Sequence, residues 1–386
     1  MNIIINELKK IFKPINIVLV TLITVIIWTL FMSFNIEYFP NGSDRYIYDV
    51  SVDILNKYGI SMDEDEFKDL KKYREKKAEE ATEYLLTKDL FVKSGCTNYD
   101  DLIKGIDNYY DGEVSKKELN DLHSKIMFEE NNYLFWELEN LDYAIDRYEN
   151  KDFWIGLGGL NESTAQKSRH EEIRESEQAY SPLNFRILQN YHNLIFGITL
   201  LILICIPALI IPIFMNDNKN KVNYLQYSSK LGRKLFNKKI IASVIGSFII
   251  ATMQLAILFV VYRTNNTYMF WDCSINSAIS DMASWYDITF GQYIVLSVIL
   301  NYIIAFITCM ISVYVSSSTN TYISAIGIQI PILFAFGMWL MDMGMKNLTF
   351  TYYPKYILHI IYFGFIILSV FGILRRIKKE KISDIN

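Results

Sequence analysis

Six long apolar segments alternate with polar stretches along this chain of 386 residues. Each is about 20 residues long, the length an α-helix needs to cross a hydrocarbon core roughly 30 Å thick. None contains Lys, Arg, Asp or Glu, which would cost about 2.5–3.5 kcal/mol each at the centre of a spanning helix. The charge-free windows are residues 15–34, 194–215, 240–262, 293–315, 322–341 and 356–373. The pattern predicts an all-α integral membrane protein, because helices of a soluble core would have shorter apolar runs, of about 10–14 residues.

With the helix ends included, we place the six transmembrane helices at residues 15–34, 190–215, 240–262, 293–315, 322–341 and 355–374. The first is expected to be a retained anchor, because its apolar run is longer than that of a signal peptide and no small-residue cleavage site follows. The largest polar segment, residues 35–189, lies between the first two spans. The other polar segments are residues 1–14, 216–239, 263–292, 316–321, 342–354 and 375–386.

The large polar segment has helical periodicity. An acidic first turn at residues 63–66 predicts a helix that continues to about residue 87. A second long pattern covers residues 116–148, and a shorter helix is expected near residues 99–110. Neither long segment contains an interior Gly or Pro, so we expect an antiparallel helical hairpin. In the segment between the third and fourth spans, Trp271, Trp285 and Tyr286 are expected to be interfacial aromatics.

Charge orients the spans. Residues 37–186 carry 34 acidic and 20 basic side chains, whereas the whole chain has 42 and 38. The excess of positive charge therefore lies in the N-terminus, the segment after the second span and the C-terminal tail. Because the chain crosses the membrane six times, these three segments lie on the same side of it. The positive-inside rule makes that side the cytoplasm. We expect a multi-pass protein of the cell membrane with both termini cytoplasmic and an acidic, mostly helical extracellular domain at residues 35–189.

The N-terminal segment, residues 1–14, is amphipathic. Ile4, Leu8 and Ile11 fall on one face at helical spacing, and Lys9 and Lys10 lie on the other. Such a helix suits the membrane interface, with lysines near anionic lipid headgroups. Pro14 then ends it and lets the chain turn into the membrane. The alternative is that these residues are only the irregular start of the first span.

Cysteine and amide side chains leave two questions open. Cys96 and Cys273 are both predicted outside the membrane and could pair, but two cysteines do not define a disulfide framework. Within the spans, Gln254, Asn301 and Gln329 either line a pathway or bond to neighbouring helices, and we favour the second interpretation.

The sequence contains no motif for catalysis, metal binding or nucleotide binding. There is no G-x-x-x-x-G-K-[ST] loop to hold nucleotide phosphates. His170 and Glu171 resemble the start of a zinc-protease helix, but Arg174 stands where the second histidine is needed, which favours a charged, solvated helix face. We therefore predict that the chain binds no cofactor itself, has no enzymatic activity of its own and has no nucleic-acid partner.

The strongest local signal is the segment at residues 216–239. It begins with Asp217, continues through a short amphipathic stretch that includes Leu225 and Tyr227, and reaches Ser229 and then a Gly232-Arg233 turn; Lys238 or Lys239 enters the third span. This order resembles the corresponding cytoplasmic segment of ABC-2 type ABC transporter permeases. The same family has an N-terminal interfacial helix, six spans and often a large outer domain between the first two, as in low-GC Gram-positive bacteria.

The resemblance implies a permease subunit driven by a separate ATPase, which would carry the ATP and Mg. It further implies a second permease subunit, identical or homologous, alongside membrane lipids, and an exported amphiphilic compound or antimicrobial peptide. Nucleotide binding would close the ATPase and move the segment at residues 216–239. The surface expected to couple the two subunits consists of Asp217, Leu225, Tyr227, Ser229, Gly232 and Arg233. A basic anchor that only fixes topology remains the alternative for this segment.

A second functional class is also open. The acidic domain at residues 35–189 would attract cationic ligands electrostatically. A membrane-anchored sensor or immunity protein could therefore capture a cationic peptide without transport. Co-purification with an ATPase distinguishes the two hypotheses.

Overall fold

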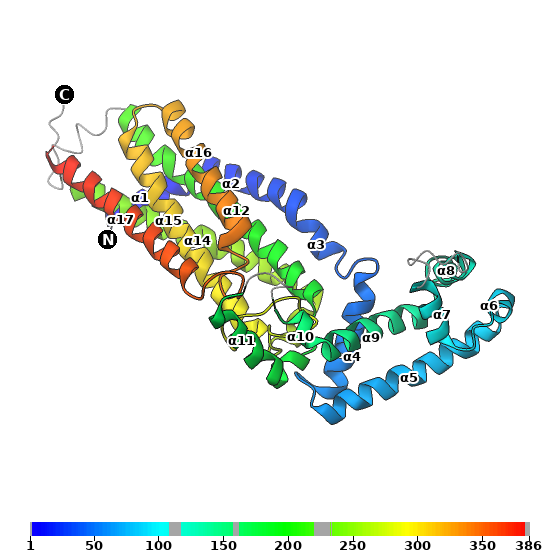
Figure 1. The fold of residues 1–386 in the computed structure, drawn as a ribbon. Coiled ribbons are helices and arrows are strands. Elements are labelled where there is room, and N and C mark those ends of the chain that lie inside the picture. The colour runs from blue at the N-terminus through cyan, green and yellow to red at the C-terminus, as the bar shows by residue number, and fades with distance from the viewer. Residues whose placement is uncertain (1, 108–116, 157–161, 220–231, 233, 383–386) are drawn as a thin grey trace. The chain divides into compact units, whose positions relative to one another are not determined.

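A computed structural model describes residues 2–107, 117–156, 162–219, 232 and 234–382 (Figure 1). Over these ranges the backbone is mostly helical and forms no β-strand, only an isolated bridge between Ser274 and Thr289. The chain divides into two compact units. The membrane unit comprises Met1–Phe39, Gln189–Tyr268 and Gly291–Asn386, and the polar unit comprises Pro40–Leu188 and Met269–Phe290. The predicted all-α fold class is confirmed.

Six helices are long and apolar enough to cross a membrane, as the sequence predicts. They are α2 (Pro14–Ile27), which continues through the π-helical turn η1 (Trp28–Met32) into α3 (Ser33–Glu37); α12 (Phe185–Lys219); α14 (Lys234–Tyr262), followed by η4 (Arg263–Asn265); α15 (Phe290–Ser318); α16 (Tyr322–Trp339), which continues into η6 (Leu340–Gly344); and α17 (Ile357–Ile382). Most of these helices extend beyond the charge-free windows, because backbone hydrogen bonding continues past the length that the hydrocarbon core requires. The amphipathic helix α1 (Asn2–Ile11) precedes them.

The helix α12 is the most enclosed span of the membrane unit. In its most apolar stretch 78% of the residues are buried, compared with 17% for the first and last spans. Polar side chains within the spans bond from one helix to the next, and this confirms the interpretation of the amides as interhelical contacts. These bonds join Gln254 to Thr24 (2.8 Å), Thr199 to Asn301 (3.0 Å) and Gln329 to Ser312.

The polar unit is built from short and medium helices around two apolar clusters. The elements are α4 (Asp44–Tyr58), α5 (Glu64–Leu86), α6 (Asp89–Ser94), α7 (Tyr99–Asp107), α8 (Lys117–Ser124), η2 (Lys125–Glu129), α9 (Tyr133–Glu149), α10 (Lys151–Trp154), α11 (Thr164–Glu175) and η3 (Glu177–Tyr180). One cluster joins α4, the first half of α5 and the second half of α9. The other joins the second half of α5 to α6, α7, α8 and the start of α9. The short turn η5 (Thr267–Phe270) adjoins the later segment of the unit.

The acidic start and long course of α5 are confirmed. The Asp63 carboxylate accepts from the backbone N–H groups of Asp65 and Glu66, and the Glu66 carboxylate accepts from the N–H of Asp63. This capping box satisfies N–H groups that the first turn leaves without intrahelical partners.

The second long helix predicted for residues 116–148 is wrong as a continuous element. It is broken between η2 and α9, where Asn131 has φ of 48°. Asparagine tolerates this left-handed conformation better than most residues. The Asn132 side chain then caps the new helix by accepting from the Leu134 N–H at 3.1 Å. A break without Gly or Pro was therefore specified by two consecutive asparagines, and the polar unit is not a simple hairpin of two long helices.

The segment Met269–Phe290 belongs to the polar unit, whereas the sequence predicted only a loop with interfacial aromatics. Its Ala278 N–H donates to the Ala179 carbonyl, and its Ile279 carbonyl accepts from the Phe185 N–H, both at 2.9 Å. Trp285 is 8% exposed. The segment lacks helical or strand periodicity because serine and asparagine side chains hold its turns, so sequence periodicity could not reveal its packing.

Histidine and cysteine in the polar unit also depart from the simplest expectations. His170 is fully buried on α11, with Nδ1 3.2 Å from Oε1 of Glu162, so the prediction of a solvated face is wrong at this residue. Cys96 and Cys273 are both free thiols. Burial raises the pKa of Cys273 to about 12 and so disfavours its reactive thiolate.

Candidate functional site

The candidate site lies at the end of the membrane unit where α12 ends and α14 begins. Of the predicted coupling residues, Leu225, Tyr227, Ser229 and Arg233 lie outside the described residues. The structure describes the other two, Asp217 and Gly232. These positions define how the segment at residues 216–239 leaves one span and enters the next.

Asp217 lies in the last turns of α12 and is only 7% exposed. Its carboxylate forms an ion pair with the ammonium of Lys239, which is 4% exposed in the second turn of α14. The sequence left Lys238 and Lys239 as equal candidates for the basic residue that enters the third span. The structure shows that Lys239 is the buried one, because its position on α14 faces α12.

Two residues of α1 extend this pair into a four-charge cluster. The Lys10 ammonium lies 3.8 Å from the Asp217 carboxylate and donates to Oε1 of Glu7 at 2.7 Å. Glu7 is 4% exposed. Two acids and two bases therefore alternate as Glu7, Lys10, Asp217 and Lys239, and we call them the ion cluster. Burying ions is costly unless each has an opposite charge close by, and this arrangement supplies that partner for every member.

The helix α1 is also held by packing against α14. Ile11 is 1% exposed, and a Cβ built on Gly246 would lie 3.0 Å from its Cδ1. Glycine at this position therefore lets the two helices approach closely. The Asn16 side chain donates to the Ile11 carbonyl at 2.8 Å and satisfies the C-terminal end of α1 just before the chain turns at Pro14. The predicted amphipathic helix is confirmed, and part of its apolar face is covered by α14.

Gly232 occupies the turn that leads into α14. Its φ is 50°, in the left-handed region that glycine adopts without a steric penalty. The Gly232 carbonyl accepts from the Leu235 N–H at 3.2 Å, which begins the helical hydrogen-bonding pattern. The conformation explains the choice of glycine in the predicted Gly-Arg turn.

The ends of the remaining spans are joined at the same end of the membrane unit. The Tyr322 hydroxyl at the start of α16 donates to Asn216 of α12 at 2.9 Å. Arg376 of α17 donates to the Ser317 carbonyl of α15 at 2.5 Å and forms an ion pair with Glu380 at 3.1 Å. The ion cluster and the Tyr322 contact therefore join α1, α12, α14 and α16, and Arg376 joins α17 to α15.

Sequence reasoning missed Glu7 and the inward role of Lys10. Lys10 was expected to face lipid headgroups, and the available signal was the single acid, Glu7, three residues before it on a helix that otherwise carries only basic charges. The four residues come from three helices, and Glu7 and Lys10 lie far from Asp217 and Lys239 in sequence, so spacing alone could not join them.

The residues of this site hold helix ends together. Among the residues that the structure describes, no group of three or more His, Cys, Asp or Glu could hold a metal ion. The ion cluster instead fixes the ends of α1, α12 and α14 relative to one another. Comparison of the chain with protein-family models, with curated proteins and with solved structures finds no match.

Proposed function

We propose that this chain is the membrane subunit of an ATP-driven ABC transporter of the ABC-2 type. It would export an amphiphilic compound or antimicrobial peptide, together with a second permease subunit and a separate ATPase. The observation that carries the proposal is the ion cluster. It fixes both ends of the charged segment that resembles the ATPase-contacting loop of these permeases.

The cluster gives a physical route for coupling. A force that a partner exerts on residues 218–231 would be transmitted to α12 through Asp217 and to α14 through Lys239. Because Lys10 and Glu7 belong to the same cluster, α1 would move with these helix ends. Such coupling requires that the partner bind the two arrangements of the helices with different free energies, and ATP-dependent closure of an ATPase dimer supplies that difference.

Charge supports the orientation that this function requires. The basic residues of the N-terminus, the segment at residues 216–239 and the tail favour a cytoplasmic position for that end of the membrane unit, where ATP is available. In this proposal the acidic polar unit lies outside the cell. No ATP-binding motif is needed in the chain itself, since the ATPase subunit binds the nucleotide and its Mg.

The test is transport in vesicles that contain the chain and a candidate ATPase chosen from neighbouring genes. Gly232→Pro would replace the left-handed turn with a residue whose φ is fixed near −65°, and Arg233→Glu would reverse a charge on the predicted contact surface. We expect both variants to insert normally and to lose ATP-driven export of the substrate. Lys378→Glu, the same charge change at an exposed position in the last helix, is the control and should transport normally.

Two results would contradict the proposal. The first is unchanged ATP-driven transport in both loop variants. The second is a chain that consistently purifies without any ATPase although the candidate ATPase is produced in the same cells. The second result would favour the membrane-anchored sensor or immunity function, which needs no ATPase.

A further inference from the structure

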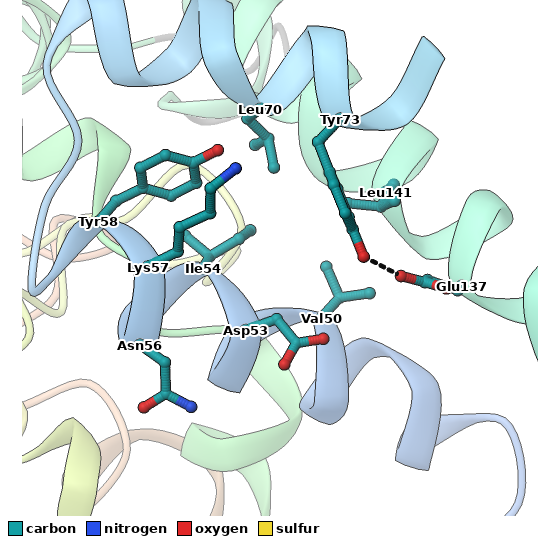
Figure 2. A pocket seen from close by; sticks show the side chains of 10 residues that line it. All are labelled: Val50, Asp53, Ile54, Asn56, Lys57, Tyr58, Leu70, Tyr73, Glu137 and Leu141. Carbon is teal, nitrogen blue, oxygen red and sulfur yellow. Dashed lines mark hydrogen bonds between the residues drawn. The ribbon is translucent and has the colours of Figure 1, made fainter. Parts of the chain in front are cut away.

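The polar unit contains a cavity of about 330 Å³ between α4, α5 and α9. Its walls combine apolar side chains from all three helices with acidic and aromatic groups, as Figure 2 shows. The volume is at the lower end of the range of roughly 300–1,000 Å³ that is usual for ligand pockets. It therefore suits one side-chain-sized group and not an extended peptide.

Most charged groups around the cavity are already paired. The Glu137 carboxylate accepts from the Tyr73 hydroxyl at 2.7 Å, and the Lys77 ammonium lies 3.2 Å from its other oxygen. The Lys57 ammonium pairs with Asp69 at 2.7 Å, and in Figure 2 it extends toward Tyr58 and away from the Asp53 carboxylate. One acid of the cavity wall lies outside these pairs.

Asp53 is that acid. Across the described part of the chain, no basic side chain forms an ion pair with it within 4.0 Å. Partial burial, together with the negative charges of Glu137 and Asp49, raises the pKa of Asp53 above its ordinary value, and the positive charge of Lys77 offsets part of this rise. The local field at this carboxylate therefore favours the arrival of a positive charge.

The remaining walls suit the alkyl part of a cation. Val50, Ile54 and Leu141 are each about 2% exposed and form the covered base of the cavity, whereas Tyr58 and Tyr73 are partly exposed and form its accessible walls. Aromatic rings complete the cavity, and they already receive an ammonium group within the chain. The Lys57 ammonium lies 4.9 Å from the ring centre of Tyr58 and 5.2 Å from that of Tyr73, within cation–π range.

We propose that this cavity binds a primary alkylammonium group, with the ammonium against the Asp53 carboxylate and the alkyl chain against the rings of Tyr58 and Tyr73. The group is either the lysine side chain of a cationic peptide or a free alkylamine, because both present the same chemistry. The site requires no ATPase, so it stands or falls separately from the proposed transport function.

The experiment is calorimetric titration of the full-length chain in detergent at neutral pH. The probes are butylammonium and N-acetyl-lysine methylamide, and N-acetyl-norleucine methylamide is the neutral probe of similar shape. We expect both ammonium probes to bind at least tenfold more tightly than the neutral one. Tighter binding of the lysine derivative than of butylammonium assigns the site to peptides, and equal or weaker binding assigns it to free amines.

Three variants identify the residue responsible. Asp53→Asn should weaken binding of both ammonium probes at least tenfold, while Asp53→Glu, which keeps the charge, should retain part of the affinity. Asp121→Asn removes the same charge from an exposed position on α8 and should bind as the unaltered chain does. Melting temperatures of all variants verify folding. The proposal is overturned if no ammonium probe binds, if the neutral probe binds equally well, or if folded Asp53→Asn retains full affinity.

Discussion

Replacing Lys239 by methionine would leave the Asp217 carboxylate buried without its nearest positive charge. Methionine has a similar length and is apolar, so the change removes the ammonium with little loss of packing. Breaking a buried ion pair from one side typically costs about 3–5 kcal/mol, mostly because the remaining ion is uncompensated. Lys10 still lies 3.8 Å from Asp217 and partly compensates it. We therefore expect a loss of about 3 kcal/mol, at the lower end of that range.

The cost should fall when the stranded charge is also removed. The double variant with Asp217→Asn and Lys239→Met keeps no buried carboxylate at this position, and replacing a whole buried pair is often close to neutral. Lys10 remains paired with Glu7 at 2.7 Å in that variant. We expect the double variant to be at least about 1 kcal/mol more stable than Lys239→Met alone.

The assay is reversible unfolding in mixed micelles with increasing SDS, followed by circular dichroism. A double-mutant cycle of the two single variants and the double variant gives the coupling free energy between Asp217 and Lys239. Lys238→Met removes an ammonium from the adjacent, less buried position and is the matched control. Equal losses in the two lysine variants, or a coupling free energy near zero, would refute the assignment of Lys239 as the buried partner.

Two further predictions concern packing and pH. Gly246→Val would place a branched side chain against Ile11, so we expect α1 to separate from α14 at a cost of about 1–3 kcal/mol. This separation should appear as faster proteolysis at the N-terminus. Adding Ile11→Ala should partly restore protection from the protease, and a lack of restoration would contradict the contact. In the folded state, burial and the charges of Glu137 and Asp49 raise the pKa of Asp53. The contribution of Asp53 to the free energy of unfolding is therefore highest when the carboxyl group is protonated, and it is lost as pH rises through the raised pKa. Asp53→Asn should therefore melt at least as high as the unaltered chain at pH 7, and the difference should disappear toward the ordinary aspartate pKa of about 3.9; a clearly lower melting temperature at pH 7 would contradict this sign.

The spans could be predicted from the sequence because their signal is local and strong. A charge-free run of about 20 residues has few physical alternatives, and the structure contains a helix at each one. The capping box at Asp63 and Glu66 is equally local, since both residues belong to the same turn. In contrast, the break before α9 depends on the backbone conformation of Asn131, and a residue type only makes that conformation accessible.

The candidate site could be predicted only in part. The charged segment and Asp217 stand out in the sequence, and Gly232 has a local conformational reason. The partners of Asp217 come from α1 and α14, and only tertiary packing brings Lys10 and Lys239 to the same carboxylate. Likewise, the cavity beside Asp53 requires α5 and α9 to pack across α4, so one acid among 34 in this region gave no signal of its own.

The sequence order of the polar unit has a consequence for biosynthesis. Its apolar cluster around α4, α5 and α9 includes Ala278 and Ile279, which are synthesised after the whole of α14. Domains generally fold as units while the chain is being made, but this one lacks part of its core until the third span has left the ribosome. Its exposed apolar surface would have to be shielded during that interval, so a chain truncated after α14 should be a substrate for chaperones and quality-control proteases.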